Sequence, residues 1–290
     1  MKCYCSVAGL PFAVHFLPSC AWDMPHNYSA FVSPASSSVL FSLRVQGSAA
    51  SVARLSRSLR PTSVATPFLW SSADSFGSVF AFSFDASSFA AVLHLGTDGA
   101  QPELYLAPSV SARHFQLSLD HSLMLLFALY AAPHQALLVH ASVVVCQGEA
   151  HAFLAPSGTG KSTHVRFWLR HLPHTSLLND DNPVVRFVGG RPVVYGSPWS
   201  GDSPCHLNRS CPLRSLVRLF RHPSDEVTPL SGAAAFAAFL PSCTCLPAHP
   251  SMSSLVADTL AQVLSTCSSF RLRCRPHAAA ALLCHAQIAK

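Results

Sequence analysis

The segment 155–162, with sequence APSGTGKS, has the residue types and spacing of a loop that binds the phosphates of a nucleotide. Such a loop curls consecutive backbone N–H groups around a phosphate, which requires small residues at Gly158 and Gly160. Ala155 replaces the glycine usual at the first position and adds only one methyl group. The residues expected to bind the nucleotide are Ser157, Gly158, Thr159, Gly160, Lys161, Ser162 and Thr163.

The surroundings of this loop argue against a chance match in a serine-rich chain. A predicted strand over 150–154 leads into the loop, and a predicted amphipathic helix over 161–171 follows it. The helix directs its positive end at the bound anion, and the Lys161 ammonium reaches the β- and γ-phosphates. We therefore expect ATP with Mg²⁺, with the Ser162 hydroxyl as one magnesium ligand.

Two adjacent carboxylates, Asp180 and Asp181, follow the next predicted strand at 176–178. A solvated turn is the simplest interpretation of such a pair. However, two neighbouring like charges are costly unless a cation or hydrogen-bond donors lie close by. A pair placed after the strand that follows a phosphate-binding helix has Mg²⁺ available, so we favour a functional role.

The elements that must position these residues belong to the second half of the chain. Residues 1–112 contain short β-like runs, at 38–45, 78–84 and 90–95, and are predicted to form a small β-rich region. Residues 113–290 are predicted to be an α/β (α+β) domain with a mixed sheet. Its other expected elements are a helix capped by Asp120 that ends before Pro133, a strand over 136–146, a hairpin over 184–195, a loop over 197–212, a strand over 213–220, helices over 232–240 and 252–267, a strand over 270–274, and a helix over 277–288.

The composition argues against nucleic-acid binding and against a membrane span. Half of the 290 residues are hydrophobic and only 11% are charged, below the roughly 25% of an average protein. The basic residues are scattered, without the dense stripe that indicates nucleic-acid binding. The most apolar stretch, 123–145, is interrupted by Pro133, His134, Gln135 and His140, so we expect no membrane span.

The 11 cysteines include no C-x-x-C pair and no zinc-finger spacing, which favours buried free thiols over a metal site. An ATP site implies the cytoplasm, where thiols stay reduced. A secretory signal over residues 1–21 is disfavoured because Pro11, His15 and Pro18 interrupt what would be its apolar region.

Three motifs together resemble the C-terminal domain of bacterial HPr kinase/phosphorylase. They are His140-Ala141-Ser142, the phosphate loop, and Asn179-Asp180-Asp181. That family, a structural relative of the ATP-type phosphoenolpyruvate carboxykinases, has the same order of strand, turn, strand and phosphate loop. The resemblance covers 136–200, and the rest of the C-terminal half more loosely. The segments 177–186 and 195–201 look like an uncharacterised branch of HPr-kinase-like proteins.

The resemblance implies a role for each matching residue. Asp181 matches the family's catalytic Asp, and His140 matches the active-site His that precedes the loop. Asp180 would act beside them as a catalytic or metal-contacting carboxylate, and would ligate Mg²⁺ together with Ser162. Since the related family forms hexamers, homo-oligomers are also implied.

Some family features have no clear counterpart in this chain. Asp202 occupies roughly the place of the family's magnesium-binding Glu, and either Arg273 or Arg275 that of a later Arg. Nothing in the first 110 residues resembles the N-terminal domain of HPr kinase, so the substrate stays open.

Two further features near the motifs have open interpretations. The loop after Tyr195 carries Trp199 together with two glycines and a proline, which favours a lid that faces the substrate over a merely packed loop. Arg214 and Arg218 alternate along a predicted strand, so both would face the same side. They would either contact a phosphate of the substrate or of ATP, or be surface charges.

We therefore expect an ATP-dependent kinase-like protein that transfers the γ-phosphoryl group to a hydroxyl of a protein or small-molecule acceptor. A carboxykinase-type reaction would require further lysine ligands, and the only lysines are Lys2, Lys161 and Lys290. The third alternative is a non-catalytic ATP-binding module in a regulatory or peptide-modification assembly, which no motif excludes.

Overall fold

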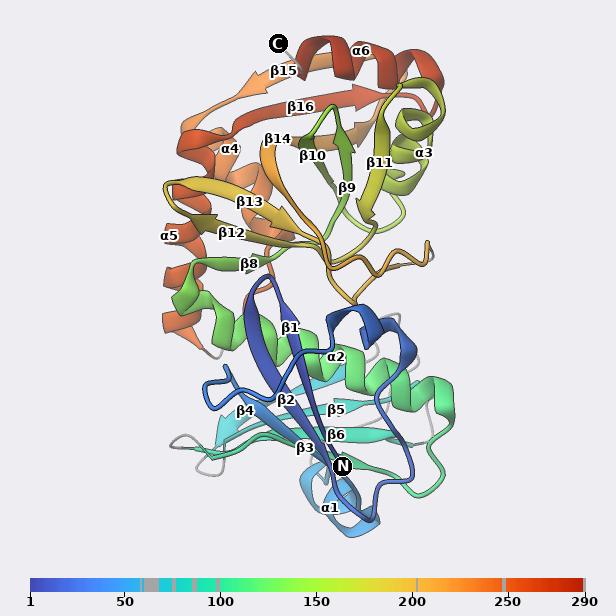
Figure 1. Ribbon diagram of the computed structural model, residues 1–290, viewed down its shortest axis with the longest axis vertical. Helices are drawn as coiled ribbons and strands as arrows, with labels where there is room; N and C mark the ends of the chain where they lie inside the picture. Colours follow the sequence, from blue (N-terminus) through green and yellow to red (C-terminus); the bar gives the residue numbers. More distant parts are fainter. Residues whose placement is uncertain are drawn as a thin grey trace. The chain divides into compact units, whose positions relative to one another are not determined.

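The computed structural model describes residues 1–57, 59, 68–74, 77–84, 88–97, 100–201, 203–246 and 249–288. The chain divides into two compact units, 1–127 and 128–290. The division falls within helix α2 (Ala112–Ala131), whereas the expected boundary lay at the start of this helix. Each unit is a mixed α/β structure built on its own mixed sheet (Figure 1).

The sheet of the first unit has the strand order β1-β2-β3-β7-β6-β5-β4. β1 and β2 form an antiparallel hairpin, and β2, β3 and β7 are parallel to one another. The remaining neighbours are antiparallel. The strands are β1 (Lys2–Val7), β2 (Leu10–Phe16), β3 (Ser42–Gly47), β4 (Phe68–Asp74), β5 (Gly77–Phe82), β6 (Ala91–Leu95) and β7 (Glu103–Leu106).

Alternation along the strands gives this sheet two apolar faces, each covered by a helix. On one face Val52 of α1 (Ala49–Leu55) packs with Val79 of β5. On the other, Phe127 of α2 packs edge-on against Phe12 of β2. A 3₁₀ helix, His26–Phe31, supplies further buried residues to this unit.

Helix α2 begins earlier than expected, and the expected cap is wrong. Ser111 precedes the helix, and its hydroxyl accepts from the backbone N–H of His114 at 3.2 Å. Asp120 instead lies in mid-helix, where its Oδ1 accepts from the Tyr28 hydroxyl at 2.7 Å and from Nδ2 of Asn27 at 3.2 Å. A partner distant in sequence thus explains a carboxylate inside an apolar helix.

The helical stretch Ala112–His134 comprises α2 and a short 3₁₀ turn at 132–134, and an 18-residue window within it has a mean hydropathy of 1.3. By length and composition this stretch is apolar enough to cross a membrane. From the sequence we expect no membrane span, because Pro133 counts as an interruption of the apolar run. Much of it is buried within the structure, as in a core helix, so the same composition fits either setting.

The sheet of the second unit has the order β11-β9-β10-β14-β13-β12-β8, and β16 and β15 extend it beside β14. β14 is parallel to β10 and to β16, and the other neighbours are antiparallel. The strands are β8 (Ala136–Leu138), β9 (Ala141–Cys146), β10 (Glu149–Leu154), β11 (Thr175–Asn179), β12 (Val184–Val188), β13 (Arg191–Tyr195), β14 (Ser210–Arg221), β15 (Glu226–Leu230) and β16 (Ser268–Cys274).

Helices cover both faces of this second sheet. α3 (Lys161–His171) and α6 (Ala278–Ile288) share a core with one face, centred on the buried Trp168 and Phe153. Leu154 and Leu216 point to the opposite face, where they meet Phe239 of α4 (Gly232–Phe239) and Leu260 of α5 (Pro250–Thr266). A 3₁₀ turn at 240–242 follows α4.

One predicted strand of this unit is wrong in detail, and another strand was not predicted. Residues 136–146 form two strands rather than one, and His140 lies at the break between β8 and β9. There its backbone N–H donates to the carbonyl of Ser242 at 2.8 Å, outside the sheet ladder. β15 was not predicted, because the polar segment 226–230 contains a proline and lies at the sheet edge.

Candidate functional site

The strand directions bring the expected functional residues to one edge of the second sheet. β10 and β14 are parallel, so their carboxyl ends lie at the same edge. β9 runs antiparallel to β10 and to β11, so the start of β9 and the end of β11 lie there too. The loop after β10, His140 before β9, and Asp180-Asp181 after β11 therefore converge. Ligands of open sheets commonly bind at the carboxyl ends of strands.

The loop between β10 and α3 adopts backbone conformations that glycine takes most readily. Gly158 has a φ of 74° and Gly160 a φ of 114°, both in the left-handed region. Gly160 is also the N-cap of α3 and offers no side chain to the first N–H groups of the helix. N–H groups at a helix start, together with the positive end of the helix dipole, favour a bound phosphate.

Lys161 is the first residue of α3, and its side chain is buried. Its ammonium donates to the carbonyl oxygen of Ala155 at 3.0 Å and to Nε2 of His140 at 2.7 Å. Burial lowers the pKa of Lys161, whereas the nearby carboxylates of Asp181 and Asp180 favour its charged form. The cation is thus directed across the loop, next to both aspartates.

His140 joins Lys161 to Asp181, since its Nδ1 lies 3.0 Å from Oδ1 of Asp181. Because Nε2 accepts from the Lys161 ammonium, a neutral imidazole carries its proton on Nδ1 and donates it to Asp181. The next backbone N–H, of Ala141, donates to the carbonyl of Asp181 at 2.9 Å. Side-chain and backbone contacts together fix the His140–Asp181 geometry.

The two neighbouring carboxylates have different surroundings. Asp180 is 7% exposed, and its Oδ1 accepts from the Ser142 hydroxyl at 2.6 Å. The side chain of Asp181 is 33% exposed. Asn179, fully buried, shapes the backbone of the pair: its Oδ1 accepts from the N–H of Asp181 at 2.9 Å, and its Nδ2 donates to the Ser197 hydroxyl at 3.1 Å. One carboxylate is therefore fixed and the other accessible.

Arg221, at the end of β14, reaches across to the phosphate loop. Its Nε donates to the carbonyl oxygen of Thr159 at 2.9 Å, and its Nη2 donates to that of Gly158. A guanidinium has five N–H donors in a planar fork, so two bonds to the loop leave it able to contact an anion as well. The exposed Arg221 thus ties the loop to the adjacent parallel strand.

These side chains surround a cavity of about 390 Å³. Three cations and two carboxylates contribute to its lining, so a polyanion and a divalent cation are both suitable occupants. The lining residues are His140, Ser157, Gly158, Gly160, Lys161, Ser162, Thr163, Arg166, Asp180, Asp181, Gly201 and Arg221. Of the residues expected to bind the nucleotide or to act in catalysis, Thr159 alone is not among these, and it lines an adjoining cavity.

The donor set at this cavity suits a hard cation. Asp180, Asp181 and Ser162 offer oxygen atoms, which are the ligands of Mg²⁺. In the described part of the chain, no group of three or more His, Cys, Asp or Glu side chains could hold a metal ion. Mg²⁺ does not require such a group, because it keeps several waters and takes oxygens from the phosphates.

The loop after β13 contributes less than expected. Trp199 is 3% exposed, and its carbonyl accepts from the N–H of Asn182 at 3.2 Å, so it is a packed residue rather than a face of a lid. Gly201 from the same loop does line the cavity, and a Cβ at this position would lie 3.2 Å from the carbonyl of Asp180. Asp202, the expected substitute for a magnesium-binding Glu, lies outside the described residues.

The other arginines considered from the sequence divide into two groups. Arg214 pairs with Glu149 at 3.7 Å, and Arg273 pairs with a carboxylate of β15 at 3.7 Å, so neither lines the cavity. Arg218 flanks the phosphate loop but donates to the hydroxyl of Ser242 at 2.9 Å. Arg275 lines the adjoining cavity.

Sequence reasoning placed the group Arg214, Arg218 and Arg221 near the chemistry but gave Arg221 no specific role, and it missed Arg166 and the supporting role of Asn179. Arg166 lies one turn beyond Ser162 on α3, and helical spacing could have indicated it. Arg221 had no local signal, because it depends on the parallel pairing of β10 and β14. Comparison with protein-family models gave no match, and comparison with curated proteins gave none either.

Proposed function

We propose that this protein binds Mg-ATP at the loop 155–162 and transfers the γ-phosphoryl group to a hydroxyl of a protein or small-molecule acceptor, within an HPr-kinase-like P-loop domain. The observation that carries the proposal is the contact chain from Lys161 through His140 to Asp181. It places a buried ammonium and an accessible carboxylate in one cavity beside the loop. Phosphoryl transfer requires both, one for the phosphates and one for the acceptor.

The binding roles follow from this geometry. The N–H groups at the start of α3 and the Lys161 ammonium would contact the phosphates. Asp180 and Ser162 would hold Mg²⁺, with Asp180 already oriented by Ser142. When bound, the ion neutralises charge on the phosphates, which lowers the cost of bringing a nucleophile to them.

The transfer step assigns the proton to Asp181. The acceptor hydroxyl oxygen bonds to the γ-phosphorus, the bond from that phosphorus to the bridging oxygen of ADP breaks, and ADP leaves with the electron pair. The hydroxyl proton passes to the free oxygen of Asp181. His140 orients this carboxylate through the bond from its Nδ1–H.

The test is transfer of labelled γ-phosphate from ATP, first to a cell extract and then to the acceptor so identified. We expect a labelled acceptor that requires Mg²⁺. If the protein binds Mg-ATP yet labels nothing, the non-catalytic binding module is the correct function. If it binds no nucleotide, the phosphate-loop assignment itself is wrong.

A further inference from the structure

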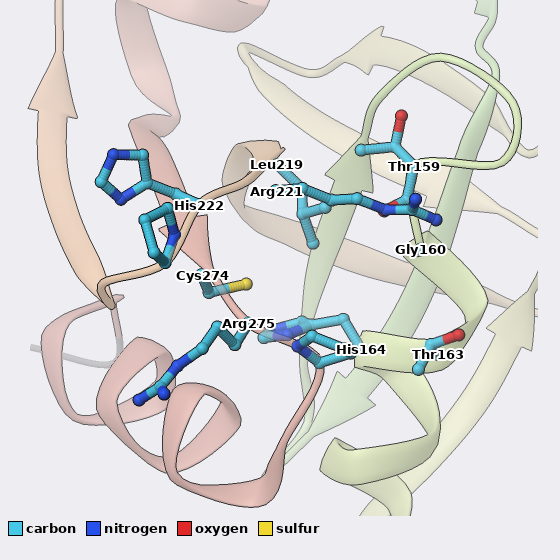
Figure 2. A pocket seen from close by; sticks show the side chains of 11 residues that line it. Thr159, Gly160, Thr163, His164, Leu219, Arg221, His222, Cys274 and Arg275 are labelled. Carbon is cyan, nitrogen blue, oxygen red and sulfur yellow. The ribbon is translucent and has the colours of Figure 1, made fainter.

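A second cavity, of about 700 Å³, adjoins the phosphate cavity (Figure 2). The two cavities share Gly160, Thr163 and Arg221, so one ligand could extend through both. Its volume lies within the usual range of small-molecule sites. Its walls come from the start of α3 and from the carboxyl ends of the parallel strands β14 and β16.

The lining of this second cavity is largely apolar and rigid. Leu219, Cys274, Pro223 and Pro276 contribute to it, and the two proline rings have restricted backbones. Flat apolar surfaces of this kind suit a planar ring. Lys161, Asp180 and Asp181, which line the phosphate cavity, are not among its lining residues.

Hydrogen bonds between the two strand ends keep this wall in shape. The N–H of His222 donates to the carbonyl of Cys274 at 3.0 Å. Asp225 accepts from the N–H of Arg275 at 3.0 Å, and its other oxygen lies 2.6 Å from Nε2 of His277. The segments that carry Pro223 and Pro276 are therefore joined, and the cavity is formed before any ligand enters.

His164 supplies one polar group to this cavity, and its tautomer can be assigned. The indole N–H of Trp168 donates to Nε2 of His164 at 3.0 Å, and an indole can only donate. Burial lowers the pKa of His164 to about 4, so the ring is neutral at pH 7. A neutral ring that accepts at Nε2 carries its proton on Nδ1, for which no described residue is an acceptor. His164 lies between Arg275 and Thr163 in Figure 2.

We infer that the second cavity binds the nucleoside of the proposed nucleotide, with the base against the two prolines and one of its acceptor atoms on Nδ1–H of His164. The inference rests on the proposed function, because the phosphate loop would anchor the other end of the ligand. Arg221 lines both cavities, so the N–H donors that it does not use on the loop are available to a ligand that spans them. A mostly apolar slot with a fixed donor recognises a heteroaromatic base with an acceptor in its plane. Thr159, Thr163, His222 and Arg275 add further polar groups to the lining.

The first experiment separates the two cavities by ligand. Binding of Mg-ATP and of Mg-tripolyphosphate to the full chain is measured by calorimetry for the wild type, Pro223→Trp and Pro229→Trp. Pro223 is exposed at the rim, so a Trp there obstructs the cavity with little risk to folding. Pro229, also exposed but in β15 and outside the cavity, is the matched control.

We expect the wild type to bind ATP about tenfold or more tighter than tripolyphosphate, and Pro223→Trp to remove this difference while leaving tripolyphosphate binding within about twofold. The control should behave as the wild type. Equal binding of both ligands by the wild type, or unchanged ATP affinity in Pro223→Trp, would overturn the nucleoside pocket but not the phosphate site. If the wild type binds neither ATP nor tripolyphosphate, both the nucleoside pocket and the proposed function are overturned.

The second experiment tests the donor on His164 from the ligand side, where folding is not at risk. ATP analogues that carry C–H in place of one ring nitrogen of adenine are compared with ATP. One analogue should bind about tenfold more weakly, because Nδ1–H then loses its acceptor. If every analogue binds the wild type as ATP does, the base does not contact His164.

Discussion

The ammonium nitrogen of Lys161 lies 2.7 Å from Nε2 of His140, which links the first residue of α3 to the break between β8 and β9. This contact explains why a histidine interrupts a strand that the sequence predicts as continuous. The interruption turns the imidazole toward the phosphate loop instead of into the core. It also fixes the tautomer that donates to Asp181, so the site is ordered by its own side chains.

Replacement of Lys161 by alanine should weaken binding of Mg-ATP by about tenfold to a hundredfold, the size of a lost charge-assisted hydrogen bond. In the proposed function Lys161 contacts the phosphates, and its ammonium is held beside the loop by Ala155 and His140. Calorimetry on both forms measures the change. Lys2→Ala, which alters a lysine of the first unit, is the matched control, and equal affinity of Lys161→Ala and wild type would refute the phosphate site.

Replacement of Asp181 by asparagine should leave ATP affinity within about twofold yet slow phosphoryl transfer by roughly two to four orders of magnitude, the span of a general base. Asparagine retains an oxygen that accepts from Nδ1–H of His140 but cannot take the proton of a hydroxyl. Transfer of labelled γ-phosphate to the identified acceptor measures the rate. Asp258→Asn is the control, because it makes the same substitution at an exposed position on α5. A variant that transfers label at the wild-type rate would show that another group is the base.

The parts of the site predicted from sequence are those with local signals. The bounds of the predicted helix 161–171 agree with α3, because the glycines, the lysine and the amphipathic pattern all lie within a few residues. The Asp180-Asp181 pair lies at the end of β11, as expected from the apolar run before it. Local propensity and short-range spacing were sufficient for these elements.

The missed parts depend on residues far apart in sequence. Arg221 contacts Gly158 across 63 residues, and nothing near either residue indicates that β10 and β14 are parallel neighbours. Asp120 was assigned as a helix cap because caps are the commonest use of Asp beside an apolar helix. Its true partner, Tyr28, lies 92 residues away in another element.

Replacement of Arg221 by alanine should weaken Mg-ATP binding by about threefold to tenfold, because the loop loses two hydrogen bonds that fix the carbonyls of Gly158 and Thr159. Hydrogen exchange of the loop amides should become faster in the free protein. Arg221→Lys keeps the charge but lacks the planar fork that spans the carbonyls of Gly158 and Thr159, so it should restore little of the loop protection. Arg209→Ala, an exposed arginine ahead of β14, is the control. Full rescue by lysine would mean that the charge matters and the tether does not.

Replacement of Asp120 by asparagine should change how the stability of the first unit depends on pH. Burial raises the pKa of Asp120 from 3.8 to about 6, against hydrogen bonds from Tyr28, Asn27 and Gln116 that favour the carboxylate. The folded state therefore binds the proton more tightly than the unfolded state. The stability that this protonation of Asp120 contributes is fully present below pH 3.8 and is lost as the pH rises through 6.

The free energy of unfolding of the wild type, relative to Asp120→Asn, should accordingly fall by about 1–3 kcal/mol between pH 4 and pH 7, at 1.36 kcal/mol per unit of pKa difference. Urea unfolding at a series of pH values, followed by tryptophan fluorescence, measures this difference, since Trp22 stacks on Phe115 in the same unit. A difference between wild type and Asp120→Asn that stays constant across this range would mean that Asp120 is ionised in the folded protein throughout, with its three donors outweighing burial.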